Sequence, residues 1–172
     1  MSSLLPSIAG AVVSGVIFYF VGLHQGRQQI RFERRADAVT ELRKRLREAK
    51  QALADLSTPA EYRSLPGIEE PPRSELADAA GEKLNALTSY HQDHALWLDE
   101  RTSEKLDDLT DEYASRWAAA EGSVGEEVEE DAMMSLWDWL GGDEDRTEEV
   151  LDALDRSLKD AAPWWRSIFS GR

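Results

Sequence analysis

The sequence lacks several features on which protein chemistry commonly rests. It has 172 residues and no cysteine, so disulfide bonds, thiolate nucleophiles and thiolate metal ligands are excluded. It also lacks the motifs GxSxG, GxxxxGKS/T, GxGxxG and HExxH, which accompany serine hydrolases, phosphate-binding loops, dinucleotide sites and zinc proteases. We therefore expect that the protein is not an enzyme and that it holds no cofactor.

Lysine is scarce and basic residues are outnumbered. The chain has 20 basic residues, only five of them lysine, against 34 acidic residues, and its net charge is −14. Residues 27–50 hold nine basic and four acidic groups, whereas residues 51–172 hold 11 basic and 30 acidic groups. An acidic surface of this kind repels nucleic acid, so nucleic acid is excluded as a partner. The same balance favours a halophilic source, with an ordinary acidic protein from a GC-rich genome as the alternative.

Charge is absent from the first part of the chain. Leu4 to Leu23 contains no Asp, Glu, Lys, Arg or His over 20 residues, which as a helix measure ~30 Å, the thickness of a bilayer core. No basic residue precedes this run, as it would in a signal peptide, and many follow it. We predict a single-pass anchor at residues 1–26 in the cell membrane, with the N-terminus outside and the remaining chain cytoplasmic.

The predicted anchor has a stripe of small residues, which lets a second helix approach closely in lipid. The stripe consists of Ser7, Gly10, Ala11, Ser14, Gly15 and Gly22. It predicts a homo-oligomer formed through the transmembrane helix. One alternative function follows from it, that of a membrane effector which oligomerises through this helix.

Residues 27–56 have the pattern of a long helix with one narrow apolar seam, interrupted at Arg35. The seam consists of Phe32, Val39, Leu42, Leu46, Ala49, Leu53 and Leu56. In a parallel homodimer Arg45 of one chain would face Lys50 of the other, and like charges there oppose pairing. We expect the seam to pack against the acidic helices later in the same chain.

Residues 57–73 contain four prolines and one glycine and are predicted to be a linker. Residues 74–172 then follow as an acidic domain with an aromatic tail. Its expected helices cover residues 74–91, 99–120 and 123–140, and a last helix begins near residue 145 and ends before Pro163. A break is expected at 95–98, with Asp99 as the cap of the helix that follows. The predicted fold class is all-α: a transmembrane helix that continues into a long amphipathic helix, followed by an antiparallel helical bundle.

His91 and His94 are three residues apart, so on a helix both imidazoles lie on one side. Two such nitrogens can bind zinc, copper or nickel, but no third ligand is close in the sequence. A metal-binding enzyme that uses this pair is a second alternative function. Two polar side chains at a helix surface are the simpler interpretation.

Six tryptophans are many for this length. Trp117 fits a core position, whereas the pair Trp137/Trp139 includes one ring that a single helical face cannot bury. The tail residues Trp164, Trp165 and Phe169 suit a membrane surface, a cap on the core or a protein partner. Because five alternating helices that start at the membrane would leave the tail at the far end, their arrangement opposes membrane contact.

The features together predict a membrane-anchored scaffold or regulator. An anchor, a charge-segregated helical domain and exposed aromatic rings favour action through an unidentified protein partner at the cytoplasmic membrane face.

Overall fold

The computed structural model describes the backbone of residues 4–59, 71–124, 129–142 and 146–160. Side chains are described for these residues from Gly26 onward, apart from that of Glu129. The described elements are the helices α1 (Leu4–Ser57), α3 (Arg73–His94), α4 (Glu100–Ser123), α5 (Glu129–Gly141) and α6 (Thr147–Asp160), with a 3-10 turn at Ala95–Trp97. No strand occurs among these residues, and the predicted all-α fold with a helical bundle is confirmed.

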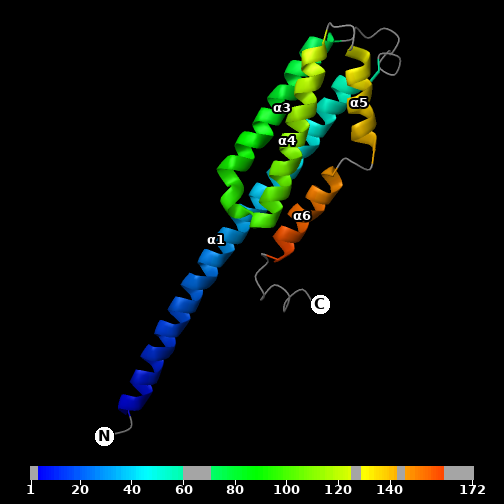
Figure 1. Cartoon of the computed structure of the whole chain (residues 1–172). Coiled ribbons are helices and arrows are strands. Elements are labelled where there is room, and N and C mark those ends of the chain that lie inside the picture. The colour runs from blue at the N-terminus through cyan, green and yellow to red at the C-terminus, as the bar shows by residue number, and fades with distance from the viewer. Residues whose placement is uncertain (1–3, 60–70, 125–128, 143–145, 161–172) are drawn as a thin grey trace, which may run out of the picture.

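The helices run along a common axis (Figure 1). α1 enters the bundle at one end, α3 returns beside it, and α4 runs in the direction of α1 again. α5 and α6 both run opposite to α1, one after the other, and each contacts both α1 and α4. Among the described residues, the bundle therefore consists of three long helices, α1, α3 and α4, and two short helices, α5 and α6, that lie end to end.

The lengths of α5 and α6 explain why they lie end to end. α5 has 13 residues and α6 has 14, so each measures ~20 Å, whereas the 22 residues of α3 measure ~33 Å. Neither short helix can cover the groove between α1 and α4 alone. Placed end to end, they cover it.

The seam of α1 forms the centre of the core. Val39, Leu42, Leu46, Ala49, Leu53 and Leu56 are all at most 1 % exposed, while Phe32, nearer the end of the bundle, is half-buried. They pack with buried residues of α3, α4, α5 and α6, including Leu87, Leu109, Met133 and Leu154. Arg45, a basic residue beside the seam, also contacts another helix of the same chain: its guanidinium lies 4.7 Å from the ring centre of Tyr90 on α3.

Arg35, which interrupts the seam, connects α1 to the last helix. Its Nη2 donates to Ser157 Oγ at 2.6 Å and lies 3.5 Å from Asp99 Oδ2. About two turns further into the bundle, Arg43 pairs with Asp155 at 2.5 Å. The C-terminal end of α6 therefore lies at the end of the bundle from which the N-terminal part of α1 extends. The expectation that alternating helices place the last helix end far from this point is wrong, because α5 and α6 run in the same direction.

Gly81 of α3 and Trp117 of α4 show why one helix tolerates an interior glycine. A Cβ built on Gly81 would lie 2.7 Å from Trp117 Cζ2, closer than real contacts allow. The half-buried indole occupies that space and donates from Nε1 to the carbonyl of Ala77 at 2.9 Å. The glycine therefore lets α3 and α4 approach each other closely.

The break and the cap at the start of α4 agree with the sequence prediction. Asp99 accepts hydrogen bonds from the backbone N–H of Thr102 at 3.0 Å and from its hydroxyl at 2.9 Å. Ser123 differs from the prediction: it does not begin the next helix but belongs to the last turn of α4, where its hydroxyl donates to the carbonyl of Ala120. Ser123 with a glutamate three residues later has the pattern of a capping box for the next helix, but this glutamate, Glu126, lies outside the described residues.

The backbone of α1 is continuous from Leu4, through the predicted anchor and into the bundle. Among the described residues, no helix combines the length and the apolar character that crossing a bilayer requires. The run Leu4 to Leu23 lies outside the residues whose side chains are described.

Candidate functional site

The outer face of α5 carries apolar side chains that the bundle does not cover. Met134 is 45 % exposed and Trp137 is 39 % exposed. Beside them, a groove of about 690 Å³ opens toward α4 and is lined by Arg116, Asp131, Met134, Ser135, Asp138, Trp139 and Gly142. An open groove with apolar and charged walls next to exposed large side chains is typical of a protein-binding surface.

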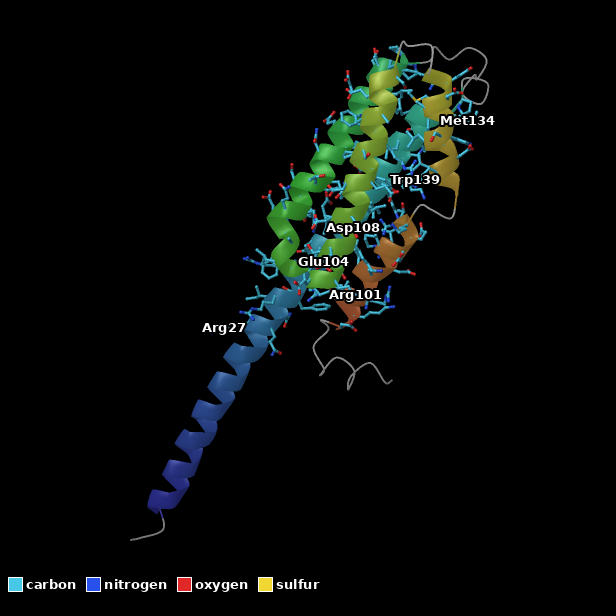
Figure 2. All side chains as sticks on the ribbon, viewed as in Figure 1. Arg27, Arg101, Glu104, Asp108, Met134 and Trp139 are labelled. Carbon is cyan, nitrogen blue, oxygen red and sulfur yellow. The ribbon has the colours of Figure 1, made fainter. Side chains whose placement is uncertain are left out.

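Trp139, labelled on α5 in Figure 2, lines this groove and is held by aromatic and charged contacts. Trp139 is 4 % exposed, meets Tyr113 edge-on at 5.6 Å between ring centres, and has the Arg116 guanidinium 4.4 Å above its ring. Below it, the hydroxyls of Tyr113 and Thr147 share a buried hydrogen bond. These contacts fix the position of the Trp139 ring beside the groove.

Two tryptophans two residues apart on α5 thus have opposite roles. Trp139 belongs to the core and Trp137 to the surface, as the helical period requires for residues separated by ~200°. The indole Nε1 of Trp139 is buried, and no described residue accepts a hydrogen bond from it. The sequence pointed to this pair but could not tell which ring was exposed.

His91 joins α3 to α4 through both of its ring nitrogens. Nε2 shares a hydrogen bond with Ser103 Oγ at 2.9 Å, and Nδ1 lies 3.1 Å from Asp107 Oδ1. Ser103 and Asp107 are one helical turn apart on α4, so they hold the ring from both sides. The connectivity equals that of a serine–histidine–aspartate triad, a feature that the sequence did not indicate because the residues come from two helices.

This histidine cluster has the bonds of a triad, but the backbone donor of its serine is already in use. His91 is 2 % exposed, and the backbone N–H of Ser103 is already donated to the carbonyl of Asp99. Acyl transfer needs free N–H donors aimed at the reacting oxygen, so we interpret the cluster as a polar link between two helices, in which the buried His91 contacts a half-buried serine and an exposed aspartate.

His94 does not complete a metal site with His91. Its Nδ1 bonds to the carbonyl of Tyr90, and its ring stacks on that of Tyr90 with 4.0 Å between centres. Among the described residues, no three His, Asp or Glu side chains are grouped to hold a metal ion. With both nitrogens of His91 engaged, no observation favours the metal-binding alternative.

A second cavity lies between the start of α4 and the end of α6. It measures about 140 Å³, and its cationic walls are Arg101, Lys105 and Arg156. Lys105 is paired with Glu149, and this hydrogen bond lowers the pKa of the Glu149 carboxyl. Burial alone would raise the pKa of the neighbouring Asp99, but hydrogen bonds from Thr102 and Ser157 outweigh it and lower that pKa.

Several residues predicted from the sequence lie outside the described side chains. These are the stripe Ser7, Gly10, Ala11, Ser14, Gly15 and Gly22, and the tail residues Trp164, Trp165 and Phe169. Oligomerisation through the stripe and contact through the tail therefore stay predictions.

No protein-family model, no curated protein and no solved structure matches the chain.

Proposed function

We propose that the protein is a single-pass membrane protein whose helical bundle binds another protein at the cytoplasmic membrane face, as a scaffold or regulator. The observation that carries the proposal is the continuity of α1, a single helix of 54 residues. Its first part contains the 20-residue run without charge, and its last part supplies the centre of the bundle core. A helix of this design holds a folded domain at a fixed height above the bilayer.

The proposed docking surface is the outer face of α5 with the groove beside it. Met134 and Trp137 supply exposed apolar area, and Arg116, Asp131 and Asp138 supply charges around it. Interfaces commonly have aromatic and methionine side chains at their centre and charged residues at their rim. We expect the partner to present an apolar surface of its own, bordered by basic residues that complement the acidic bundle.

Affinity purification of the full chain in mild detergent tests the proposal. The wild-type protein should retain a partner in stoichiometric amount, and a Met134→Glu/Trp137→Glu variant should lose it. Both side chains are exposed, so the variant should keep its helix content and its melting temperature.

Leu96→Glu is the matched control, because Leu96 is also a large apolar residue, 74 % exposed, but lies on the 3-10 turn away from α5. This variant should bind the partner as the wild type does. Recovery of the wild-type protein alone would count against the proposed function. Equal loss of the partner in both variants would refute the α5 face as the docking surface.

A further inference from the structure

We propose that the 3-10 turn Ala95–Trp97 is a second membrane contact, in which Leu96 and Trp97 enter the headgroup layer of the bilayer that holds α1. This inference rests on the membrane anchor of the proposed function and deepens it. The second contact fixes the angle between the bundle and the bilayer, and with it the direction in which the α5 face is presented to a partner.

The turn carries the most exposed large apolar side chain among the described residues. Leu96 is 74 % exposed, and the next residue, Trp97, is half-buried. Leu98, by contrast, packs against the core of the bundle. An exposed leucine beside a tryptophan suits a membrane surface, because the indole ring is favoured at the level of the headgroups.

The fold places this turn at the end of the bundle from which the N-terminal part of α1 extends. The turn contacts α1 directly, and Oδ2 of Asp99, two residues after Trp97, lies 3.5 Å from Nη2 of Arg35. Figure 2 shows Arg101, at the start of α4, at this end of the bundle, and Arg27 on the arm of α1 that leaves it. The turn therefore belongs to the part of the bundle nearest to the predicted anchor.

The turn reaches the headgroup layer at an ordinary tilt of α1. Arg35, at the level of the turn, follows Leu23 by 12 residues, which is ~18 Å along the helix. The axes of packed helices are ~9 Å apart, so a tilt of ~30° toward the turn places it ~11 Å above the hydrocarbon core. The headgroup layer occupies roughly 5–8 Å of this height. The side chains of Leu96 and Trp97 are long enough to cover the remainder.

The charge distribution favours this end of the bundle over the rest. The segments that meet there, 27–37, 91–105 and 153–160, hold eight basic and eight acidic residues. The rest of the chain holds 12 basic and 26 acidic residues. Because the surface of a cytoplasmic leaflet is negative, it repels the acidic part of the bundle and not the neutral end.

The absence of cysteine permits a direct test on the full chain. Three single variants, Gly26→Cys, Gln92→Cys and Ser74→Cys, place a fluorophore on the arm of α1, near the end of α3 and at its start. All three positions are exposed. Gln92 and Ser74 are 18 residues apart, so they lie on the same face of α3, ~27 Å from each other along the helix.

Each labelled protein is reconstituted in phosphatidylglycerol/phosphatidylcholine vesicles that contain a lipid with a nitroxide on its headgroup. The nitroxide quenches only fluorophores close to the membrane surface. The labels at positions 26 and 92 should be quenched, and the label at position 74 should not.

The outcomes separate the two proposals. Quenching at position 26 without quenching at position 92 would overturn the second contact, including the case in which a protein covers Leu96, and leave the anchor intact. Equal quenching at positions 92 and 74 would show that the bundle lies along the surface and would overturn a contact through one end. Absence of quenching at position 26 would overturn the anchor and this inference with it.

A pair of variants identifies the side chain that makes the contact. Leu96→Glu should reduce the quenching at position 92 to the level at position 74, while the quenching at position 26 persists. Met134→Glu is the matched control, because Met134 is also a large apolar residue, 45 % exposed, but lies on α5, away from this end (Figure 2). It should leave the quenching at position 92 unchanged.

Both substituted side chains are exposed, so both variants should keep the helix content of the wild type. Unchanged quenching at position 92 in the Leu96→Glu variant would overturn the inference. An equal loss of quenching in both variants would do the same, because the loss would then follow from added negative charge and not from the turn.

Discussion

Gly81→Ala is the sharpest test of the packing, because two effects of opposite sign compete at this position. Alanine is better than glycine in a helix interior by about 1 kcal/mol, so propensity alone predicts stabilisation. In this fold the new Cβ would lie 2.7 Å from Trp117 Cζ2 and 3.1 Å from Cε2. The indole would have to move and would lose its hydrogen bond to Ala77.

The structure predicts that the steric effect is larger. Overpacking costs roughly 1–3 kcal/mol, and a lost hydrogen bond costs roughly 0.5–1.5 kcal/mol. After the gain in propensity is subtracted, the variant should lose about 0.5–3.5 kcal/mol of a total stability of roughly 5–15 kcal/mol. The melting temperature of the full chain in detergent, followed by circular dichroism, should fall by several degrees, roughly 2–4 °C per kcal/mol.

Gly122→Ala is the matched control, since Gly122 is also helical and nothing lies within 4 Å of a Cβ built there. It should leave the melting temperature unchanged or raise it slightly. In a Trp117→Leu background, Gly81→Ala should become neutral or stabilising, because the clashing ring is gone. If Gly81→Ala is as stable as the wild type and leaves the tryptophan emission unchanged, the close contact between α3 and α4 is not real.

Three other predictions concern the core, the cap and the long helix. Leu46→Ala removes a fully buried side chain and should cost ~2–5 kcal/mol in denaturant unfolding of the full chain, and a cost typical of a surface site would contradict its burial. The pKa of Asp99 is lowered in the fold, so its charge stabilises the fold at pH values above the unfolded pKa of about 3.9, and this stabilisation is lost as the pH falls through the folded pKa. The difference in melting temperature between wild type and Asp99→Asn should therefore shrink in acid. A difference that is constant with pH would argue against the charged cap. A peptide of residues 27–56, with residues 74–172 removed, should be mostly unfolded and monomeric at low salt by circular dichroism and sedimentation, whereas a stable helical homodimer would show that α1 pairs with itself.

The helical seam and the breaks between helices were readable from the sequence because both are local. Leu42, Leu46 and Leu53 recur at helical spacing, and that spacing alone puts them on one face of α1. Asp99 caps α4 through a bond three residues away, so the cap also depends only on its neighbours.

Contacts between helices were not readable in this way. Glycine in a helix interior lowers helix stability, and the reason for Gly81 became clear only when Trp117, 36 residues later, was seen to fill the space beside it. In the same way, the sequence spacing suggested that His91 and His94 act together, whereas in the fold the partners of His91 are Ser103 and Asp107 on α4. Such contacts depend on how two helices are rotated and shifted against each other, which the period of one helix does not specify.

By itself, the sequence determined that the chain is helical, which face of each helix is apolar, and where charge is concentrated. Only the tertiary structure decided the direction of the last helix. A short connection permits the chain either to reverse or to continue, and the choice between them depends on which arrangement buries more apolar surface. Because the groove between α1 and α4 is about as long as α5 and α6 together, continuing along it covers the whole groove, and α6 ends beside Arg35.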